Sequence, residues 1–547
     1  MGFLRIFAVS LLFFGCAKKE VDLIVFNAQV ITLDDDLPAA EAFVVAQGKI
    51  LFTGSNKEVF DLFESKHILD VQTKTVMPGI IDAHAHFYQL GLGLQEVDLR
   101  GTQSKKEVIE RITEFEPYKT ADFIVARGWD QNDWEDQSYP TKEDLDAVFP
   151  DVPVALQRVD GHALWVNSKA LKMAGIDKAG PVPGGMIMGN AQWSPNGILV
   201  DAPCDRVFEL IPEPTTEISA RALQSAQDYC FSLGLTGVHD AGLRRSVIEL
   251  IDSLQEADIL RIKLDAMVSN IEPDVSYFLA KGPTVKHRLR VGAIKVYADG
   301  ALGSRGAALR APYSDDPGHF GAIITPMDEL RSLADRALAS GFQVNTHAIG
   351  DSANVSVLRV YQKVLAKQKN VRWRIEHAQV VPPNYFGAFS KNIIPSVQPT
   401  HATSDMYWVE ERLGKDRMAG AYAYNSLLNQ AGLLALGTDF PVEYVNPMLT
   451  LSAAVYRRDT QGYPESGFYP NEGITREQAL KGMTLWAAFA NFSENQRGSL
   501  TPGKDADFIL LDQNPLECPL EEISQIKVLK TFVDGHQVYS LESTLGL

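Results

Sequence analysis

The chain contains little cysteine, and the apolar run at its N terminus is too short to cross a bilayer. Only four of its 547 residues are cysteine. Cys204, Cys230 and Cys518 form an odd set without metal-ligand spacing, so we interpret them as buried thiols and not as a disulfide framework. The run over residues 6–14 is well below the ~20 apolar residues that a transmembrane helix needs. No internal repeat or low-complexity tract occurs, which leaves a globular protein.

Basic residues are also few. The 51 Lys and Arg against 69 Asp and Glu give a formal net charge of -18, which disfavours nucleic acid and anionic lipid surfaces as partners. We therefore expect a small-molecule substrate and no nucleic acid. The length and the 45% hydrophobic content allow two or more domains with a large core. No coiled-coil seam indicates a partner chain, and an oligomer is left open.

The first sixteen residues read MGFLRIFAVSLLFFGC, with Arg5 ahead of the apolar run and Gly15 ahead of Cys16. This order is typical of a signal segment, so residues 1–16 are left out of the fold prediction. The end of the segment resembles a bacterial lipobox, in which Cys16 becomes the lipid-modified first residue of the mature chain. We predict an exported bacterial lipoprotein whose only membrane attachment is this lipid. The alternative is an ordinary cleaved signal and a periplasmic protein.

Short β-branched runs separated by turn residues occupy both ends of the chain, at residues 21–75 and 497–541. Asp534 and Gly535 are typical of a hairpin turn in the second of these segments. Two segments of the same texture, one at each end, predict a small β-sandwich domain assembled from both chain ends. A larger domain, residues 76–496, is then inserted between them.

Eight apolar runs alternate with helical patterns in this larger domain, which predicts parallel βα units. The runs are residues 76–87, 152–162, 235–242, 291–300, 342–351, 373–379, 394–401 and 432–442. Their number and order predict an α/β fold of the (β/α)8 TIM-barrel type. Two stretches are too long for simple connections: about 91–149, predicted to be a cap, and 180–203, predicted to be a β-hairpin flap.

His84 and His86 end the first run, in DAHAHF. Side chains alternate across a strand, so these two imidazoles emerge on one face, about 6 to 7 Å apart. At the mouth of a barrel, two neutral imidazoles on one face can bind a single cation, with zinc or a similar transition ion preferred. An isolated H-x-H pair also occurs by chance on surface strands.

Three further ionisable residues lie late on other runs: His347, His377 and Asp439. Taken singly, each histidine could be a core residue and Asp439 a helix N-cap. A lone buried carboxylate is costly unless it is paired or bound to a metal. Four histidines and an aspartate at one barrel mouth exceed what a core needs, which favours a metal centre.

Lys295, in AIKVYADG, alternates with Ile294 and Val296 and is predicted to face the barrel interior. A buried lysine must lose its charge, pair with a carboxylate or be modified. Carbamylation by CO2 would give an anionic oxygen ligand able to bridge two metal ions. An ion pair with Asp299 or Asp240 is the alternative.

These residues carry a family resemblance. With the motifs GWDQNDW, KVYADGALGSRGAAL, THAIGD, IEHAQ and GTDFPV, the chain resembles the metal-dependent amidohydrolase superfamily, and within it the amidohydrolase-3 branch that contains N-substituted formamide deformylases and exported hydrolases. The resemblance implies that His84 and His86 bind one metal ion, that His347 and His377 bind the other, and that carbamylated Lys295 bridges them. It also implies that Asp439 contacts a metal and acts as general base. Single-metal sites also occur in the superfamily, so the resemblance implies either one or two divalent ions, which we expect to be zinc.

The predicted function is hydrolysis of a non-peptide C–N bond, of the amide or N-acyl/N-formyl type, by a metal-bound hydroxide. Alternatives are an ester or lactone hydrolase or a deaminase on the same scaffold, or a non-catalytic exported binding protein. His162, His239 and Arg305 are predicted to contact the substrate.

Overall fold

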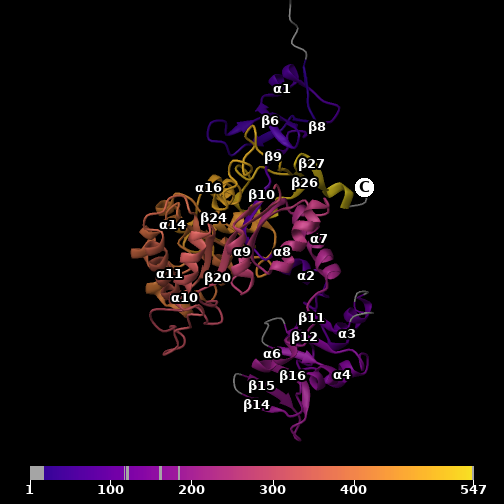
Figure 1. The fold of residues 1–547 in the computed structure, drawn as a ribbon. Helices are drawn as coiled ribbons and strands as arrows, with labels where there is room; N and C mark the ends of the chain where they lie inside the picture. The colour runs from indigo at the N-terminus through magenta and orange to yellow at the C-terminus, as the bar shows by residue number, and fades with distance from the viewer. Residues whose placement is uncertain (1–17, 116–117, 119–121, 159–162, 183–184, 545–547) are drawn as a thin grey trace, which may run out of the picture. The chain divides into compact units, whose positions relative to one another are not determined.

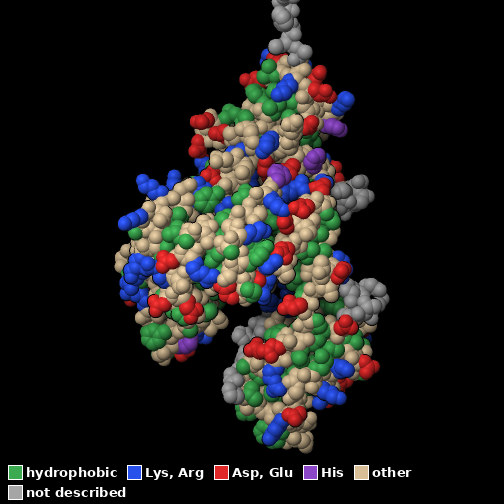
Figure 2. Space-filling view, in the orientation of Figure 1, with side chains coloured by type: hydrophobic (Ala, Val, Ile, Leu, Met, Phe, Trp, Pro, Cys, Tyr) green, Lys and Arg blue, Asp and Glu red, His purple; other side chains and the backbone are tan. Residues whose placement is uncertain are grey.

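The computed structural model describes residues 18–115, 118, 122–158, 163–182 and 185–544 (Figure 1). The chain divides into two compact units, Met1–His86 with Gln227–Leu547, and Phe87–Ala226. The predicted signal segment with Cys16, and also His162, lie outside the described residues. None of the described helices is long and apolar enough to cross a membrane. On the face shown in Figure 2, acidic and basic side chains are interspersed, so charge of either sign is spread over that face.

The first unit contains a nearly closed barrel of eight parallel strands within the described part of the chain. In order around the barrel these are β10 (Ile80–Ala85), β17 (Leu235–Leu243), β18 (Lys263–Ser269), β20 (Leu289–Tyr297), β21 (Gln343–Ala348), β22 (Trp373–His377), β23 (Ile393–Val397) and β24 (Ala435–Leu436). Two hydrogen bonds join the segment after the last strand to the end of the first: Asp439 N–H donates to His84 O and His86 N–H donates to Phe440 O, both at 2.8 Å. The predicted TIM barrel is confirmed.

Helices follow most of the barrel strands. Those of the first unit include α8 (Arg245–Glu256), α9 (Asp274–Lys281), α10 (Met327–Ala339), α11 (Asp351–Val364), α12 (Pro399–Asp405), α14 (Tyr424–Ala431), α15 (Pro447–Tyr456), α16 (Arg476–Gly482) and α17 (Leu485–Ala490). The sequence of α11 shows why they pack on the strands: Ala353, Val357 and Tyr361 recur every four residues and are buried. An apolar stripe with this spacing covers one helix face.

Two sheets form the β-sandwich, and one of them combines both ends of the chain. The first sheet has the order β6 (Lys49–Gly54), β5 (Ala42–Ala46), β2 (Leu23–Phe26), β8 (Ile68–Asp70). The second has the order β27 (His536–Ser540), β26 (Val528–Val533), β25 (Phe508–Leu511), β9 (Thr75–Pro78), β3 (Gln29–Ile31), β4 (Ala39–Ala40). Phe43 of the first sheet and Phe508 of the second meet edge to face at 5.0 Å in the shared core. The predicted domain built from both chain ends is confirmed.

A buried ion cluster connects the barrel to the C-terminal part of the sandwich. The Nζ of Lys263, on β18, lies 2.7 Å from Asp505, 2.7 Å from Asp507 and 2.8 Å from Asp534. Lys263 is fully buried. Burial alone would lower the pKa of Lys263, but the three carboxylates outweigh it and raise the pKa. A charged lysine is therefore held where the two domains meet.

One predicted barrel strand is wrong, because it belongs to a sheet of the second unit. Residues 152–162, predicted as the second barrel run, contain β12 (Val154–Arg158), which pairs with β11 (Ile124–Trp129) and β13 (Ala163–Val166) in a separate sheet. That sheet continues through β16 (Pro195–Asp201), β15 (Gly185–Gly189) and β14 (Gly180–Val182), which span the predicted flap. The missed barrel strand is β18, where charged residues interrupt the apolar pattern. The unit also contains α3 (Lys105–Glu114), α4 (Lys142–Asp146), α5 (Ser168–Met173) and most of α7 (Thr216–Ser232).

Candidate metal centre

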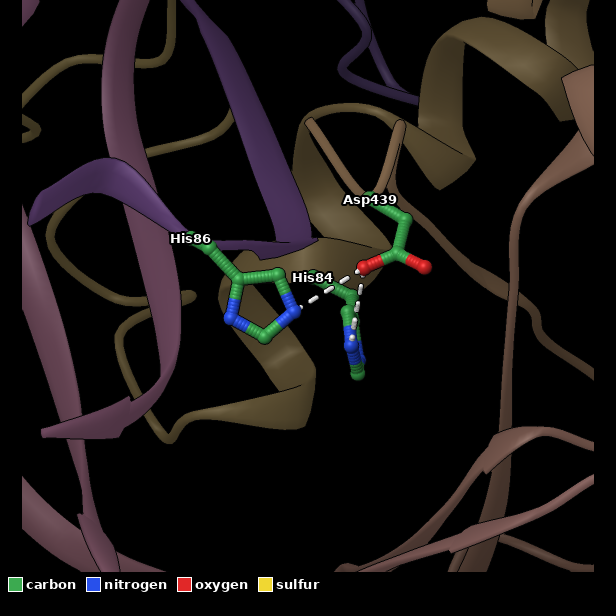
Figure 3. A group of neighbouring side chains, drawn as sticks. All are labelled: His84, His86 and Asp439. Atoms are coloured by element: carbon green, nitrogen blue, oxygen red, sulfur yellow. Dashed lines mark ion pairs between the residues drawn. The ribbon is translucent and has the colours of Figure 1, made fainter. Parts of the chain in front are cut away.

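His84 and His86 meet Asp439 where the first and last barrel strands join. Asp439 Oδ1 lies 3.2 Å from His86 Nε2 and 3.5 Å from His84 Nε2 (Figure 3). This oxygen is buried and has no hydrogen-bond donor in the described part of the chain. A carboxylate oxygen without a donor, facing two imidazole nitrogens, is an arrangement that a cation would satisfy.

The tautomer of His84 is fixed by Glu376, which forms a buried ion pair with Arg374. The Nδ1–H of His84 donates to the Glu376 carboxylate, so Nε2 is the nitrogen left to face Asp439. Glu376 is held by Arg374, whose Nε donates to Oε1 at 2.6 Å. Burial and the charge of Lys295 lower the pKa of His84 to about 4, which keeps the ring neutral, as a metal ligand must be. Sequence reasoning missed Glu376 and Arg374, although alternation places them on one face of the strand.

A second group of donors lies on the other side of Asp439. Its Oδ2 is 3.3 Å from Nε2 of His401, and the ligand atoms of His377, His401 and Asp439 lie within 4.8 Å of one another. Burial alone would lower the pKa of His401, but hydrogen bonds to Asp439 and Glu443 outweigh it and raise the pKa to about 10. His401, in the first turn of α12, was not among the predicted site residues.

His347 lies beside His377, with ring centroids 4.5 Å apart. His347 Nε2 and His377 Nδ1 are both buried without a hydrogen-bond partner among the described residues. Burial lowers the pKa of His347 to about 3 and that of His377 well below its ordinary value, so both rings are neutral. Unsatisfied buried nitrogens are rare in native proteins, and here they line the same space as the other donors.

Lys295 reaches the same place from β20. Its Nζ lies 3.2 Å from His84 Nε2, and the side chain is 1% exposed. Burial lowers the pKa of Lys295 to about 8. Asp299 is not its partner, because that carboxylate accepts the backbone N–H groups of Ile349 and Gly350 as well as that of Ala308. The amine therefore directly contacts a nitrogen of a candidate metal ligand.

The predicted substrate contacts do not join this group. His239 is buried on β17, with Nδ1 2.9 Å from Arg374 and Nε2 2.8 Å from Asn491, so neither nitrogen is left for a substrate. Arg305 pairs with Asp315 at 2.9 Å, which already neutralises its charge. His239 and Arg305 are unavailable to a substrate for the same reason: each already interacts with another side chain of the protein. His162 is not among the described residues.

The backbone supports a functional role for two of the candidate ligands. His377 has φ 72° and Asp439 has φ 65°, both in the left-handed region that residues other than glycine rarely adopt. Such conformations concentrate at active sites and ligand sites. Neutral imidazoles with unpartnered carboxylate and nitrogen atoms fit a divalent transition ion such as zinc.

Known proteins resemble this chain over nearly its whole length. A family model described as the Amidohydrolase family matches residues 67–539. Protein LONG AFTER FAR-RED 3 from Arabidopsis thaliana is 33% identical over 95% of this chain and 91% of its own length. N-substituted formamide deformylase from Arthrobacter pascens is 27% identical over 94% of this chain and 97% of its own. The crystal structure of an uncharacterized metal-dependent hydrolase from Pyrococcus furiosus has a TM-score of 0.76 and 27% identity, covering 90% of this chain and 100% of that one.

Proposed function

Because the chain belongs to the amidohydrolase family, we propose that it is a metal-dependent hydrolase that cleaves the C–N bond of an N-acyl or N-formyl amine. The observation that carries the proposal is Asp439 Oδ1, buried and without a donor in the described chain, between His84 Nε2 and His86 Nε2. The substrate class follows the relative named as an N-substituted formamide deformylase.

The residues that would hold the metal come from four barrel strands and the segments that follow them. His84, His86 and Asp439 would hold one divalent ion, which we take to be zinc because the donors are nitrogen and oxygen. By the family resemblance, His347 and His377 would hold a second ion. A bound divalent ion lowers the pKa of a coordinated water towards about 7 and polarises a substrate carbonyl.

Lys295 would bridge the two ions as a carbamate. Its pKa of about 8 leaves more of the amine neutral at pH 7 than in an ordinary lysine, and the neutral amine is the form that attacks CO2. The ammonium first loses one proton. The neutral amine nitrogen then bonds to the carbon of CO2 as one C–O π bond opens and a second proton leaves, so the cationic side chain becomes an anion. The change replaces a charge that repels metal ions beside His84 with one that binds them.

Asp439 would move the proton. The imidazoles of His401 and His86, each close to one of its oxygens, outweigh the effect of burial and hold the pKa of Asp439 well below its usual range, so it is a carboxylate at neutral pH. It can accept a proton from the attacking water and donate it to the leaving nitrogen. The water oxygen bonds to the carbonyl carbon, the C–N bond breaks, and the products are a carboxylic acid and an amine.

The test is turnover of matched substrates by the zinc-loaded protein. N-formyl and N-acetyl amines should release free amine, whereas the corresponding esters and an aromatic amine should react more slowly or not at all. Asp439→Asn should lower kcat about 10²- to 10⁴-fold, the usual contribution of a general base. Faster ester cleavage, or ammonia release from the aromatic amine, would replace the amide assignment. No turnover of any class by metal-loaded protein would favour a binding protein.

We also infer that the protein is exported and carries lipid on Cys16, on the strength of the signal-like segment and LLFFGC. Metabolic labelling with palmitate tests this. Label that is lost on Cys16→Ser supports the lipoprotein, and an unlabelled, periplasmic wild type would leave a simple secreted hydrolase.

A further inference from the structure

Tyr297 is the last residue of strand β20 and follows Lys295 by two positions. Side chains two positions apart on a strand lie on the same face, so Tyr297 shares the inward face of Lys295. Lys295 is 1% exposed, whereas Tyr297 is 43% exposed. The tyrosine ring therefore lies at the mouth of the barrel, on the solvent side of Lys295.

The ring contacts two residues of the candidate metal centre. Lys295 Nζ lies 4.7 Å from the ring centroid, and the ring centroids of Tyr297 and His347 are 5.4 Å apart. The register explains the second contact, because Tyr297 pairs with His347 across β20 and β21. The phenolic oxygen would lie 3.8 Å from a Cβ atom on Gly242, near the end of β17. Since β18 separates β17 from β20 in the sheet, the phenol reaches across part of the barrel mouth.

The hydroxyl of Tyr297 is free to donate a hydrogen bond. The backbone oxygen of Tyr297 accepts a 2.7 Å hydrogen bond from Thr325, but the hydroxyl has no partner in the part of the chain that the structure describes. A phenol is an O–H donor at neutral pH. By contrast, His239 and Arg305 already interact with other side chains. Tyr297 is therefore a donor beside the candidate metal centre that a substrate can use.

We propose that the Tyr297 hydroxyl donates a hydrogen bond to the substrate carbonyl oxygen and stabilises the negative charge that this oxygen acquires during hydrolysis. This inference rests on the proposed function, because it assigns a substrate-contacting residue to that hydrolase. As the water oxygen bonds to the carbonyl carbon, the C=O π electrons move onto the carbonyl oxygen, and they return when the C–N bond breaks. The phenol keeps its proton throughout. A donor already oriented toward the developing charge lowers the barrier.

Replacing Tyr297 with phenylalanine removes the hydroxyl and keeps the ring that packs against His347. With the N-acetyl amine as substrate, Tyr297→Phe should lower kcat about 10²- to 10³-fold, the usual effect of removing one oxyanion donor, while the metal bound per chain stays that of the wild type. The matched control is Tyr463→Phe, because Tyr463 is also exposed, at 57%, but stacks on Tyr407. The control should keep the kcat of the wild type.

A tetrahedral analogue distinguishes a hydrogen bond to the reacting oxygen from a packing role. The methylphosphonamidate of the same amine carries an anionic oxygen in place of the carbonyl oxygen. It should bind Tyr297→Phe about 10²- to 10³-fold more weakly than the wild type, whereas the product amine should bind both equally well. Unchanged kcat and analogue affinity, or loss of bound metal together with activity, would overturn the inference and leave the proposed function standing. A wild type that hydrolyses none of the matched substrates would refute the proposed function and, with it, this inference.

Discussion

Replacing Glu376 with glutamine should weaken metal binding without removing a metal ligand. Glu376 and Arg374 are both fully buried, and Glu376 accepts from Arg374 at 2.6 and 2.9 Å and from His84 Nδ1. A glutamine amide in either orientation turns an NH2 group toward a donor, Arg374 or His84. Arg374 also loses its counter-charge inside the barrel.

Two effects follow, with different magnitudes. Breaking one partner of a buried ion pair costs about 3–5 kcal/mol, so Glu376→Gln should lower the free energy of unfolding of the metal-free protein by that amount. Loss of the carboxylate that orients His84 should weaken binding of the metal ion that we propose His84 holds about 10- to 100-fold, or about 1.4–2.8 kcal/mol of binding free energy. Chemical denaturation measures the first and titration against a chromophoric chelator measures the second.

Glu494→Gln is the matched control. Glu494 forms a bidentate pair with Arg372, at 2.8 and 2.9 Å, just before the same strand, but touches no imidazole. The control should lose stability and keep the metal dissociation constant of the wild type. Equal metal affinity in Glu376→Gln and in the control would refute the claim that Glu376 positions His84.

Three further outcomes are expected. Lys295→Ala should bind fewer metal ions per chain than the wild type by elemental mass spectrometry, and bicarbonate should raise metal loading of the wild type but not of this variant. Burial raises the pKa of Asp299 from 3.8 to about 7, so its contribution to stability is present below pH 3.8 and is lost as the pH rises through about 7. Urea denaturation in EDTA should show the unfolding free energy falling over this range, and falling less in Asp299→Asn. Lys263→Met should lower that free energy by about 3–5 kcal/mol, because three carboxylates lose their shared cation; an unchanged value would show that the cluster adds nothing.

Most of the barrel could be predicted from apolar runs, and the one error has a physical cause. Strand β12 is apolar because it lies inside its own sheet in the second unit, so its sequence is typical of a barrel strand. Strand β18 belongs to the barrel, but Lys263 and Asp265 interrupt its apolar residues, so its sequence does not indicate a buried strand. The partners of Lys263 lie more than 240 residues later in the sequence, at Asp505 and beyond. Local patterns cannot reveal a charge whose compensation is that distant.

Alternation along the strands predicted part of the candidate site, whereas residues whose partners are known only from the fold were missed. His84 and Lys295 follow the alternation of β10 and β20 and meet as expected, with Lys295 Nζ 3.2 Å from His84 Nε2. His401 lies on a helix after β23, and its relation to Asp439 exists only in the folded barrel. In the sequence, Arg374 and Glu376 look like exposed charged residues. They are buried because they pair with each other and Glu376 accepts from His84, which only the structure shows.

Because the β-sandwich combines both chain ends, it can be completed only late in synthesis. While the ribosome is still adding residues after about position 500, β9 has no β25 to pair with, and the ammonium of Lys263 has none of its three carboxylates. The barrel strands have all emerged by then, yet β18 carries an uncompensated charge. Release of the last fifty residues therefore completes the fold, and a nascent chain or a truncated one that ends before Asp505 should be a substrate for chaperones and proteases and not a smaller working enzyme.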